Sequence, residues 1–399
     1  MTSLIGGSTI EEELSTLFPW TERAPAIAPD EYRARLDKAR SLTAKLEGDA
    51  LIIGAGASLR YFASVGWGAS ERLVALVLPP EGDPVIICPK FELGTLSSSL
   101  AIDGFDIRCW EEDDDPYALT AQRLAEIGAR RVLIDPALAF TMASRLGEAA
   151  RGVELIDATP VIDGCRSIKS PAEIALMQQA KSMTLEVHRR TARMLRPGLS
   201  TEEARRFIDD AHRRIGAAGS SFCIVLFGEA SSYPHGVPYE QYLKEGDIVL
   251  IDTGCTVQGY NSDITRTYVF GEPSAEHRRI WALEKEAQQA AFEAAHIGAP
   301  CETVDAAARK VIADAGFGPD YRLPGLPHRT GHGIGLSVHE APYLVRGDKT
   351  PLAPGMCFSN EPMIVIPGAF GVRLEDHFHM TDAGPRWFTK PSPSIDQPF

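Results

Sequence analysis

Short apolar runs and helical patterns follow one another along the first 165 residues. Apolar runs typical of buried strands occupy residues 50–54, 72–79, 84–89 and 130–135. Residues 28–48 have the periodicity of a helix that ends at Gly48, and a second helix is expected over residues 117–128. This succession predicts an N-terminal α/β domain over residues 1–165.

A strong helix start marks the beginning of a second domain. Ser170 is a suitable N-cap, Pro171 fits the first helical position, and Glu173 places an acid in the first turn. Another helix is expected from Ser200 onwards. We therefore predict that the second domain spans residues 166–399.

In the second domain, strands and long helices fall into separate blocks. Strands are expected at residues 222–228, 248–254, 263–270, 356–366 and 371–380, and long helices at 275–297 and 303–315. Such segregation favours an α+β fold over a doubly wound sheet. The fold class predicted for the whole chain is therefore α+β, with an N-terminal α/β domain.

Charge and composition exclude several classes of partner. A net charge of −14 argues against binding to nucleic acid or to an anionic membrane, because phosphate groups would be repelled. The chain has no run of 18 apolar residues, and its start is acidic rather than basic, so neither a transmembrane helix nor a signal peptide is expected. Seven cysteines without a C-x-x-C pair suggest reduced thiols in a cytoplasmic protein.

Two pairs of acids interrupt the apolar strands of the second domain. Asp252 ends an apolar run, and Asp263 follows eleven residues later. In a hairpin these two carboxylates would lie opposite each other, with Cβ atoms about 5 Å apart. Glu361 and Glu375 are placed in the same way about Gly368. Carboxylates at this distance repel each other unless a cation or a shared proton lies between them.

The ten histidines all lie between His188 and His379, and three of them fall in the glycine-rich segment 328–347. This segment could be a metal site, a phosphate loop or a tight turn, and it lacks the Lys-Ser/Thr pair of a phosphate loop. Four carboxylates and a neutral imidazole could hold two divalent cations, whose charges they balance. An oxygen-rich set favours Mn²⁺, with Co²⁺ or Zn²⁺ as substitutes.

Taken together, these motifs resemble the pita-bread metallopeptidases, a family that includes methionyl aminopeptidases, Xaa-Pro aminopeptidases and Xaa-Pro dipeptidases (prolidases). The matching motifs are IDTG…SDITRT, GHGIGLSVHE and EP…GVRLED, and the resemblance is closest to the prolidase-like members. It implies a C-terminal pita-bread catalytic domain of the creatinase/aminopeptidase type. The metal ligands that it implies are Asp252, Asp263, His332, Glu361 and Glu375.

The same resemblance implies roles for other side chains. His235 and His339 would face the substrate and stabilise the tetrahedral intermediate by hydrogen bonds. Glu361 would both bind metal and transfer a proton. Arg373, two residues before Glu375 on the same strand face, would orient the carboxylate of that ligand. The glycines on either side of the implied histidine ligand would let the backbone approach the ions closely.

The implied reaction is hydrolysis of the peptide bond before proline by a hydroxide that bridges two divalent ions. An Xaa-Pro dipeptidase that acts on short peptides is the leading interpretation, and the resemblance also implies a homodimer. The alternatives are an Xaa-Pro aminopeptidase that acts on longer peptides and a non-enzymatic peptide-binding protein. Creatine hydrolysis on this fold uses no metal, so the complete ligand set argues against it.

Some residues depart from the family pattern or lie outside its roles. Val365 occupies a position where related sequences commonly have a tyrosine near the metals. His377 and His379 alternate along the strand of Glu375, but they are not expected to be ligands, because five are already present. Arg346 could contact a substrate carboxylate, although a surface role is favoured.

Overall fold

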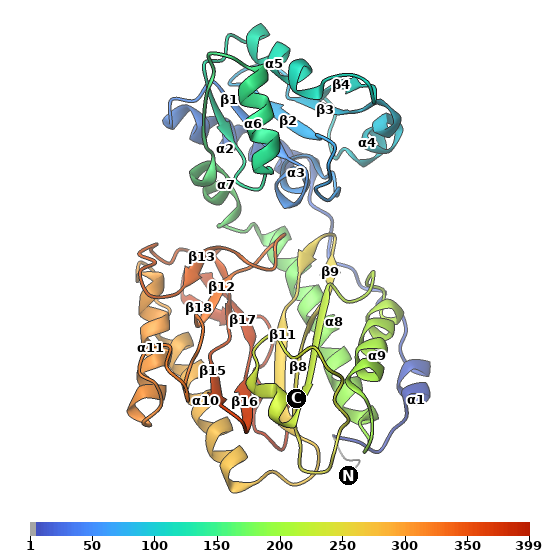
Figure 1. Cartoon of the computed structure of the whole chain (residues 1–399), viewed down its shortest axis with the longest axis vertical. Helices are drawn as coiled ribbons and strands as arrows, with labels where there is room; N and C mark the ends of the chain where they lie inside the picture. The colour runs from blue at the N-terminus through green and yellow to red at the C-terminus, as the bar shows by residue number, and fades with distance from the viewer. Residues whose placement is uncertain (1–4) are drawn as a thin grey trace. The chain divides into compact units, whose positions relative to one another are not determined.

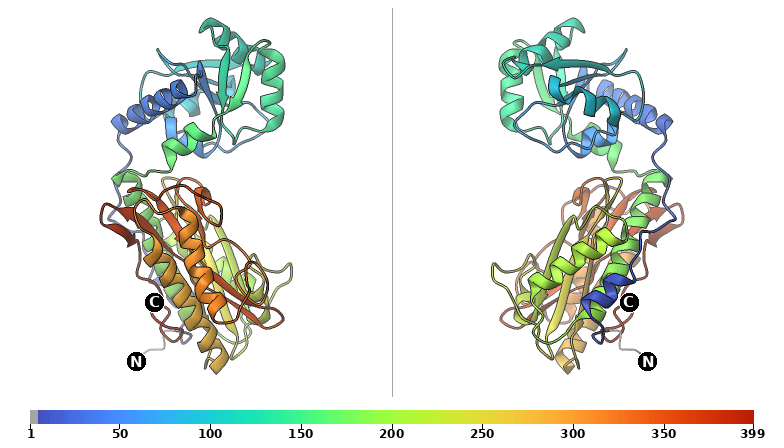
Figure 2. Two further views of the ribbon diagram at one scale, coloured as in Figure 1. Left: turned by 90° about the vertical axis from the view of Figure 1, so that its left-hand side faces the viewer. Right: turned by 90° about the vertical axis from the view of Figure 1, so that its right-hand side faces the viewer.

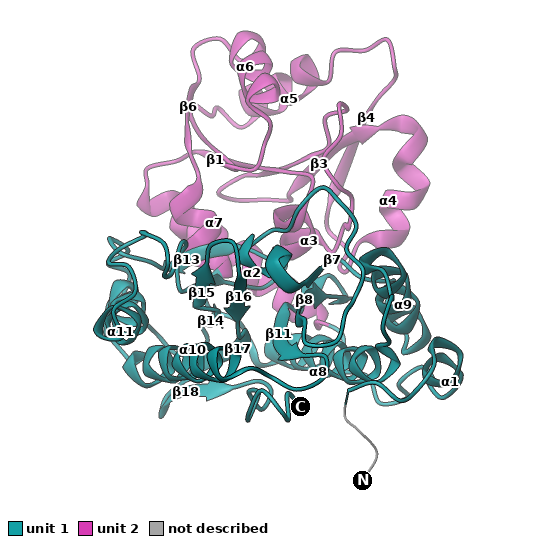
Figure 3. Ribbon diagram, turned by 60° about the horizontal axis from the view of Figure 1, so that its bottom comes forward, with its two compact units in different colours: residues 1–26, 167–399 teal, residues 27–166 magenta. Residues whose placement is uncertain are grey.

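The computed structural model describes residues 5–399, which form two compact units (Figure 3). Unit 1 contains the described residues up to Ala26 together with Ser167–Phe399, and unit 2 contains Ile27–Arg166. This mixed α/β architecture confirms the predicted fold class. Within residues 5–399, no helix combines the length and the apolar composition needed to cross a membrane.

Unit 2 is built around a six-stranded mixed sheet with the strand order β4-β3-β2-β1-β5-β6. Its strands are β1 (Ala50–Gly54), β2 (Ala75–Leu78), β3 (Val85–Pro89), β4 (Asp106–Trp110), β5 (Arg131–Ile134) and β6 (Glu154–Asp157). Its helices are α2 (Pro29–Lys45), α3 (Ala57–Ala63), η1 (Lys90–Glu92), α4 (Leu93–Ser99), α5 (Pro116–Glu126), α6 (Phe140–Ala149) and α7 (Thr159–Arg166). Figure 2 shows α2 and the α5–α6 pair on opposite sides of this sheet.

Burial explains which strands of unit 2 are visible in the sequence. Every residue of β1, β2 and β3 is buried, so these strands appear as continuous apolar runs. The edge strands β4 and β6 are partly exposed and carry polar residues. For that reason their sequences give no apolar signal.

Unit 1 is a larger assembly of curved strands and long helices (Figure 1). Its helices are α1 (Ile10–Ser15), α8 (Pro171–Met194), α9 (Thr201–Arg214), η2 (Gly228–Ser232), α10 (Ala275–Ala294) and α11 (Cys301–Asp314). The strands before α10 are β7 (Phe222–Phe227), β8 (Ile248–Gly254), β9 (Thr256–Val257), β10 (Tyr260–Asn261) and β11 (Ile264–Val269). The strands after α11 are β12 (Gly331–Gly333), β13 (Glu340–Leu344), β14 (Cys357–Asn360), β15 (Met363–Ile366), β16 (Phe370–Arg373), β17 (Asp376–Thr381) and β18 (Gly384–Trp387).

Two main sheets carry the site of unit 1. One has the order β11-β8-β7, the other has the order β13-β12-β14-β17-β18, and β15 pairs with β16. Helices α8 and α10 pack against these strands, and Figure 3 shows both on the same side of them. The helix starts predicted at Ser170 and Ser200 are confirmed, because each serine forms a capping box with the glutamate three residues later.

The N-terminal segment differs from the prediction, which placed all of residues 1–165 in one domain. Residues 1–4 lie outside the described part of the chain, but α1 packs against α8 and α9 of unit 1. The buried carboxylate of Glu13 accepts hydrogen bonds from Arg190 at 3.3 Å and from Arg193 at 2.8 Å. These long-range ion pairs attach the segment to unit 1, and no local sequence pattern reveals them.

The two strands expected at residues 356–366 and 371–380 are each split in two. The first is interrupted between Asn360 and Met363, and the second between Arg373 and Asp376. The ladders on both sides of the breaks have one common register, with Asn360 opposite Asp376 and Met363 opposite Arg373. That register places Glu361 opposite Glu375, as the sequence predicts.

The register of the other acidic hairpin differs from the prediction. Asp252 lies opposite Thr265 rather than opposite Asp263, because the turn is centred one residue later than expected. The observed partner of Asp252 lies two residues after the expected one, and a shift of two residues leaves every side chain on the same face of the sheet. Asp252 and Asp263 are therefore diagonal neighbours on one face.

A buried ion pair joins the two sheets of unit 1. Arg266 Nη2 on β11 lies 2.7 Å from Asp376 Oδ1 on β17, and both side chains are fully buried. Arg266 also donates a hydrogen bond to the carbonyl oxygen of Glu375 at 2.9 Å. The pair thus fixes β11 relative to the strand break at Glu375.

Removal of one partner should strongly destabilise unit 1. The substitution Asp376→Ala leaves the Arg266 guanidinium buried without a counter-charge, which typically costs about 3–5 kcal/mol. Urea unfolding should show this loss, whereas Glu272→Ala, which removes an exposed partner of Arg278, should leave the midpoint nearly unchanged. Equal midpoints for the two variants would show that the buried pair does not join the sheets.

Candidate metal centre

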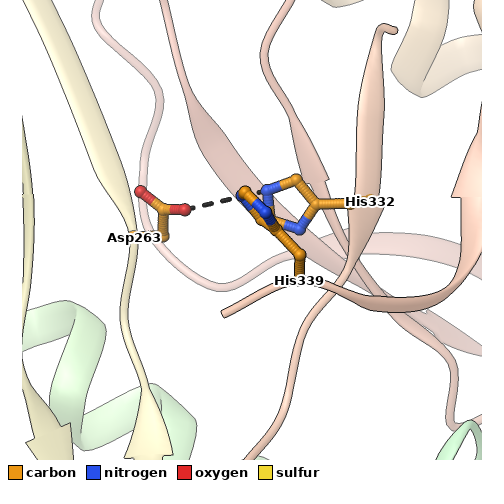
Figure 4. A group of neighbouring side chains, drawn as sticks. All are labelled: Asp263, His332 and His339. Atoms are coloured by element: carbon orange, nitrogen blue, oxygen red, sulfur yellow. Dashed lines mark ion pairs between the residues drawn. The ribbon is translucent and has the colours of Figure 1, made fainter. Parts of the chain in front are cut away.

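The structure brings the five predicted ligands together where the two acidic hairpins of unit 1 meet. His332 Nε2 lies 3.0 Å from Glu361 Oε1 and 3.7 Å from Asp263 Oδ2, as Figure 4 shows for the second pair. Atoms of His332, Glu361 and Glu375 that could bind a metal all lie within 4.8 Å of one another. Asp252 completes the group as the diagonal neighbour of Asp263.

Unpaired polar atoms converge on this cluster. Buried side-chain atoms without a hydrogen-bond partner include, among the described residues, Asp252 Oδ1, Asp263 Oδ1, His332 Nε2 and Glu375 Oε1. Each such atom costs about 1–3 kcal/mol when it is left unsatisfied in a protein interior. Carboxylate oxygens and an imidazole lone pair are together a suitable donor set for divalent cations. The residues therefore fit the metal ions that the sequence leads us to expect.

The hydrogen bond of His332 Nδ1 determines which of its nitrogens is available. His332 Nδ1 lies 3.0 Å from the carbonyl oxygen of Gly333, and because a carbonyl only accepts, Nδ1 carries the proton. The lone pair of a neutral imidazole is then on Nε2, which faces the carboxylates. Metal-binding histidines are commonly oriented by such a hydrogen bond.

The glycines beside His332 lie where neighbouring strands pack closely together. A Cβ atom on Gly331 would lie 2.2 Å from the carbonyl oxygen of Ser359, and one on Gly333 would lie 2.5 Å from that of Glu340. The close approach of neighbouring strands therefore requires glycine at both positions. Ser359 Oγ in turn accepts a hydrogen bond from His332 N at 2.9 Å and donates one to Glu361 Oε1 at 3.0 Å.

Arg373 contacts a different acid from the one predicted. Its Nη2 atom lies 2.6 Å from Asp252 Oδ2, and no direct contact with Glu375 is present among the described residues. Instead, Arg373 Nε donates to Thr265 Oγ1 at 3.1 Å, and that hydroxyl donates to Glu375 Oε2 at 2.7 Å. Thr265 can link Arg373 to Glu375 because it lies opposite Asp252, the acid that Arg373 contacts, in the β8–β11 ladder.

The crowding of carboxylates strongly affects their ionisation. Burial and the nearby negative charges raise the pKa of Asp263 and of Glu375 well above their ordinary values. Burial also raises the pKa of Asp252, against the opposing effect of Arg373. Burial acts in the same direction on Glu361, whose pKa is lowered only when His332 is protonated, because Nε2 can then donate to Glu361 Oε1 at 3.0 Å. Without a cation the cluster thus carries a large electrostatic cost.

A cavity of about 750 Å³ opens beside the cluster. Its lining residues are Ser221, Phe222, Ile224, Tyr233, Pro234, His235, Gly236, Asp252, Asp263, Pro327, His328, Arg329, His332, Val338, His339, Glu361 and Arg373. His235 and His339 are exposed to this cavity, where the sequence predicts them, and the His339 ring lies 4.1 Å from that of His332 (Figure 4).

The phenol expected near the metals has no counterpart at Val365. That side chain is buried in β15 and is not among the residues that line the cavity. The hydroxyl of Tyr260 donates to Glu173 Oε1 at 2.9 Å, so Tyr260 does not replace it. Tyr233 does line the cavity and is 47 % exposed.

Arg329 also lines the cavity, although it belongs to none of the sequence motifs. Its guanidinium lies 4.4 Å from the centre of the Tyr343 ring and has no hydrogen bond or ion pair within the described part of the chain. Arg346, for which the sequence favours a surface role over contact with a substrate carboxylate, pairs with the exposed Asp320. The only sequence signal for Arg329 is a basic residue three positions before His332.

Helix α11 holds the segment that carries Arg329. Asp305 Oδ1 accepts hydrogen bonds from Thr330 N at 3.1 Å and from Thr330 Oγ1 at 2.8 Å. Arg309, paired with Asp305 at 2.9 Å, donates to the carbonyl oxygen of His328. The backbone on both sides of Arg329 is therefore fixed by a buried ion pair.

Fold and site together define a pita-bread metallopeptidase. The chain belongs to Metallopeptidase family M24, which it matches over residues 175–382, and residues 35–168 match the Creatinase/Prolidase N-terminal domain. These matches confirm the family that the sequence motifs resemble.

Known relatives cover most of the chain. It is 39% identical over 355 residues to the probable dipeptidase PepE of Mycobacterium tuberculosis, covering 88% of this chain and 93% of the relative. The crystal structure of dipeptidase PepE from Mycobacterium ulcerans has a TM-score of 0.85 and 37% identity, covering 92% and 97% of the two chains. Prolidase from Thermococcus sibiricus has a TM-score of 0.84 and 31% identity, covering 92% and 98%.

The close packing at Gly331 gives a direct test of the cluster. In Gly331→Ala, the added Cβ should push β12 away from β14, displace His332, and destabilise the protein by about 1–3 kcal/mol. Calorimetric titration of the chelator-treated protein with Mn²⁺ should show affinity reduced at least about tenfold. Gly94→Ala is the matched control, because nothing lies within 4 Å of a Cβ atom at that position. An unchanged affinity of Gly331→Ala for Mn²⁺ would contradict the assignment of His332 as a metal ligand.

Proposed function

We propose that this protein is an Xaa-Pro dipeptidase that hydrolyses the peptide bond before proline in a metal-dependent reaction. The observation that carries the proposal is the buried cluster of unpaired carboxylates around His332, which opens into a cavity with two exposed imidazoles. Relatives named as dipeptidases and a prolidase support the same activity.

Five side chains would hold two divalent ions, and the predominance of oxygen donors favours Mn²⁺. They are Asp252, Asp263, His332, Glu361 and Glu375. When bound, two such metal ions would polarise the scissile carbonyl as Lewis acids and would make hydroxide available from water at neutral pH.

Glu361 is the residue that we assign to proton transfer. Glu361 lines the cavity, and Ser359 Oγ holds one of its carboxylate oxygens by a hydrogen bond of 3.0 Å. Glu361 accepts a proton from the attacking water, whose oxygen bonds to the carbonyl carbon, and passes that proton to the proline nitrogen as the C–N bond breaks. The products are a free amino acid and proline.

His235 and His339 would stabilise the oxygen of the scissile carbonyl as negative charge develops on it. Both imidazoles are exposed in the cavity wall. Burial and the neighbouring His332 lower the pKa of His339 to about 4, so this imidazole is neutral at neutral pH and has one N–H to donate.

Arg329 gives a reason to favour a dipeptide over a longer peptide. An Xaa-Pro bond has no amide N–H, so the enzyme must recognise the terminal amine, the proline ring or the terminal carboxylate. The Arg329 guanidinium faces the cavity without a carboxylate partner, and a dipeptide brings its own. In a longer peptide, the carbonyl after proline is an uncharged amide.

Metal dependence is the first test of the proposal. Protein freed of metal by a chelator should not hydrolyse Ala-Pro, and addition of Mn²⁺ should restore hydrolysis. Asp263→Asn should remain inactive under the same conditions, because it weakens the set of ligands. Absence of hydrolysis by wild-type protein with bound Mn²⁺ would contradict the proposal and favour a peptide-binding role.

The function of Arg329 can be tested with paired substrates. Arg329→Met should lower kcat/KM for Ala-Pro by about 10–100-fold, the value of a charged hydrogen bond of about 1.5–3 kcal/mol. Hydrolysis of Ala-Pro amide, which lacks the carboxylate, should change little. Arg346→Met is the control and should behave as wild type, because Arg346 pairs with Asp320 away from the cavity. Faster hydrolysis of Ala-Pro-Pro than of Ala-Pro would instead indicate an aminopeptidase.

A further inference from the structure

We infer that His377 is an additional metal-binding residue, which would bind a divalent ion together with Asp263 and Glu375. This inference rests on the proposed metal site and extends its set of five ligands. It departs from the sequence interpretation, in which the set is already complete without His377.

The position of His377 places it beside two of the proposed ligands. It lies two residues after Glu375 and pairs with Ser359 in the β14–β17 ladder. Its Nε2 atom is 3.9 Å from Glu375 Oε1, and its side chain is fully buried. Metal-binding atoms of Asp263, Glu375 and His377 all lie within 4.8 Å of one another.

The hydrogen-bonding state of His377 is unusual for a buried imidazole of this protein. Neither of its ring nitrogens has a hydrogen-bond partner among the described residues. By contrast, the buried His188 bonds to the carbonyl oxygen of Ile264 at 2.9 Å through Nε2. His212 is paired through both nitrogens, with Ser220 at 2.9 Å and with Thr184 at 3.1 Å.

A cation between His377 and Glu375 accounts for two unpaired atoms at once. Glu375 Oε1, the carboxylate oxygen that faces His377, also lacks a partner, whereas Glu375 Oε2 is bonded to Thr265. A metal ion binds a lone pair from each of them, and so removes the cost of burying both.

The added imidazole changes the expected metal preference. With His377, the proposed ligand set contains two imidazoles, His332 and His377, each grouped with Glu375. Nitrogen ligands favour Co²⁺ and Zn²⁺ relative to Mn²⁺, which prefers oxygen. Loss of His377 should therefore weaken Co²⁺ binding more than Mn²⁺ binding.

The test compares His377→Leu with His379→Leu, its neighbour in β17, whose ring packs 4.9 Å from that of Phe388. Calorimetric titration of chelator-treated protein with Co²⁺ should show that His377→Leu weakens one site at least about tenfold, with an altered visible spectrum. Without metal, this variant should unfold at or above the wild-type temperature, because it loses two unpaired polar atoms. His379→Leu should bind Co²⁺ like wild type.

Wild-type Co²⁺ affinity and spectrum in a folded His377→Leu variant would overturn the inference. So would a variant destabilised without metal but unchanged in affinity, because that result indicates a structural role. If the variant does not fold, pulsed EPR of the Mn²⁺-loaded wild-type protein decides: two coordinated imidazoles support His377, and one excludes it. No peptide is needed, so metal binding through His377 in a protein that does not hydrolyse Ala-Pro would contradict only the proposed function.

Discussion

Mutual repulsion of carboxylates in a buried space is the constraint on which the rest of unit 1 depends. Asp252, Asp263 and Glu375 are almost entirely buried, and the one arginine that pairs with a carboxylate group of the cluster, within the described residues, is Arg373. Strand breaks, a serine and a threonine hydroxyl, and the ion pair of Arg266 all hold the acids in place against this repulsion. The fold thus stores electrostatic energy that a divalent cation can release.

Much of the site was predictable because charged side chains occupy positions where the strand pattern calls for apolar ones. An aspartate in place of an apolar residue, as at Asp252, is costly unless a cation compensates it, and this cost can be read from the sequence. The symmetric spacing of Glu361 and Glu375 about Gly368 gave their register correctly. Helix starts at Ser170 and Ser200 were equally clear, since capping is a local interaction.

Features that depend on distant contacts could not be predicted in this way. The sequence shows two continuous strands where the structure breaks both, because the N–H groups of Glu361 and Glu375 bond to Thr330 and Thr265 of other segments. The partner of Arg373 was misassigned for a related reason: strand periodicity gives the face of a side chain, but not which neighbouring strand it meets. Arg329 was missed because only the cavity distinguishes it from a surface arginine.

The unpaired atoms of the cluster have a consequence for the life of the protein in a cell. A ligand that binds only the folded state stabilises it in proportion to the logarithm of its free concentration. The abundance of this protein should therefore follow the supply of its metal, since proteases degrade chains that open more often. A shortage of metal would then reduce the number of protein molecules as well as the fraction that contains metal. The cell would not accumulate metal-free, inactive protein.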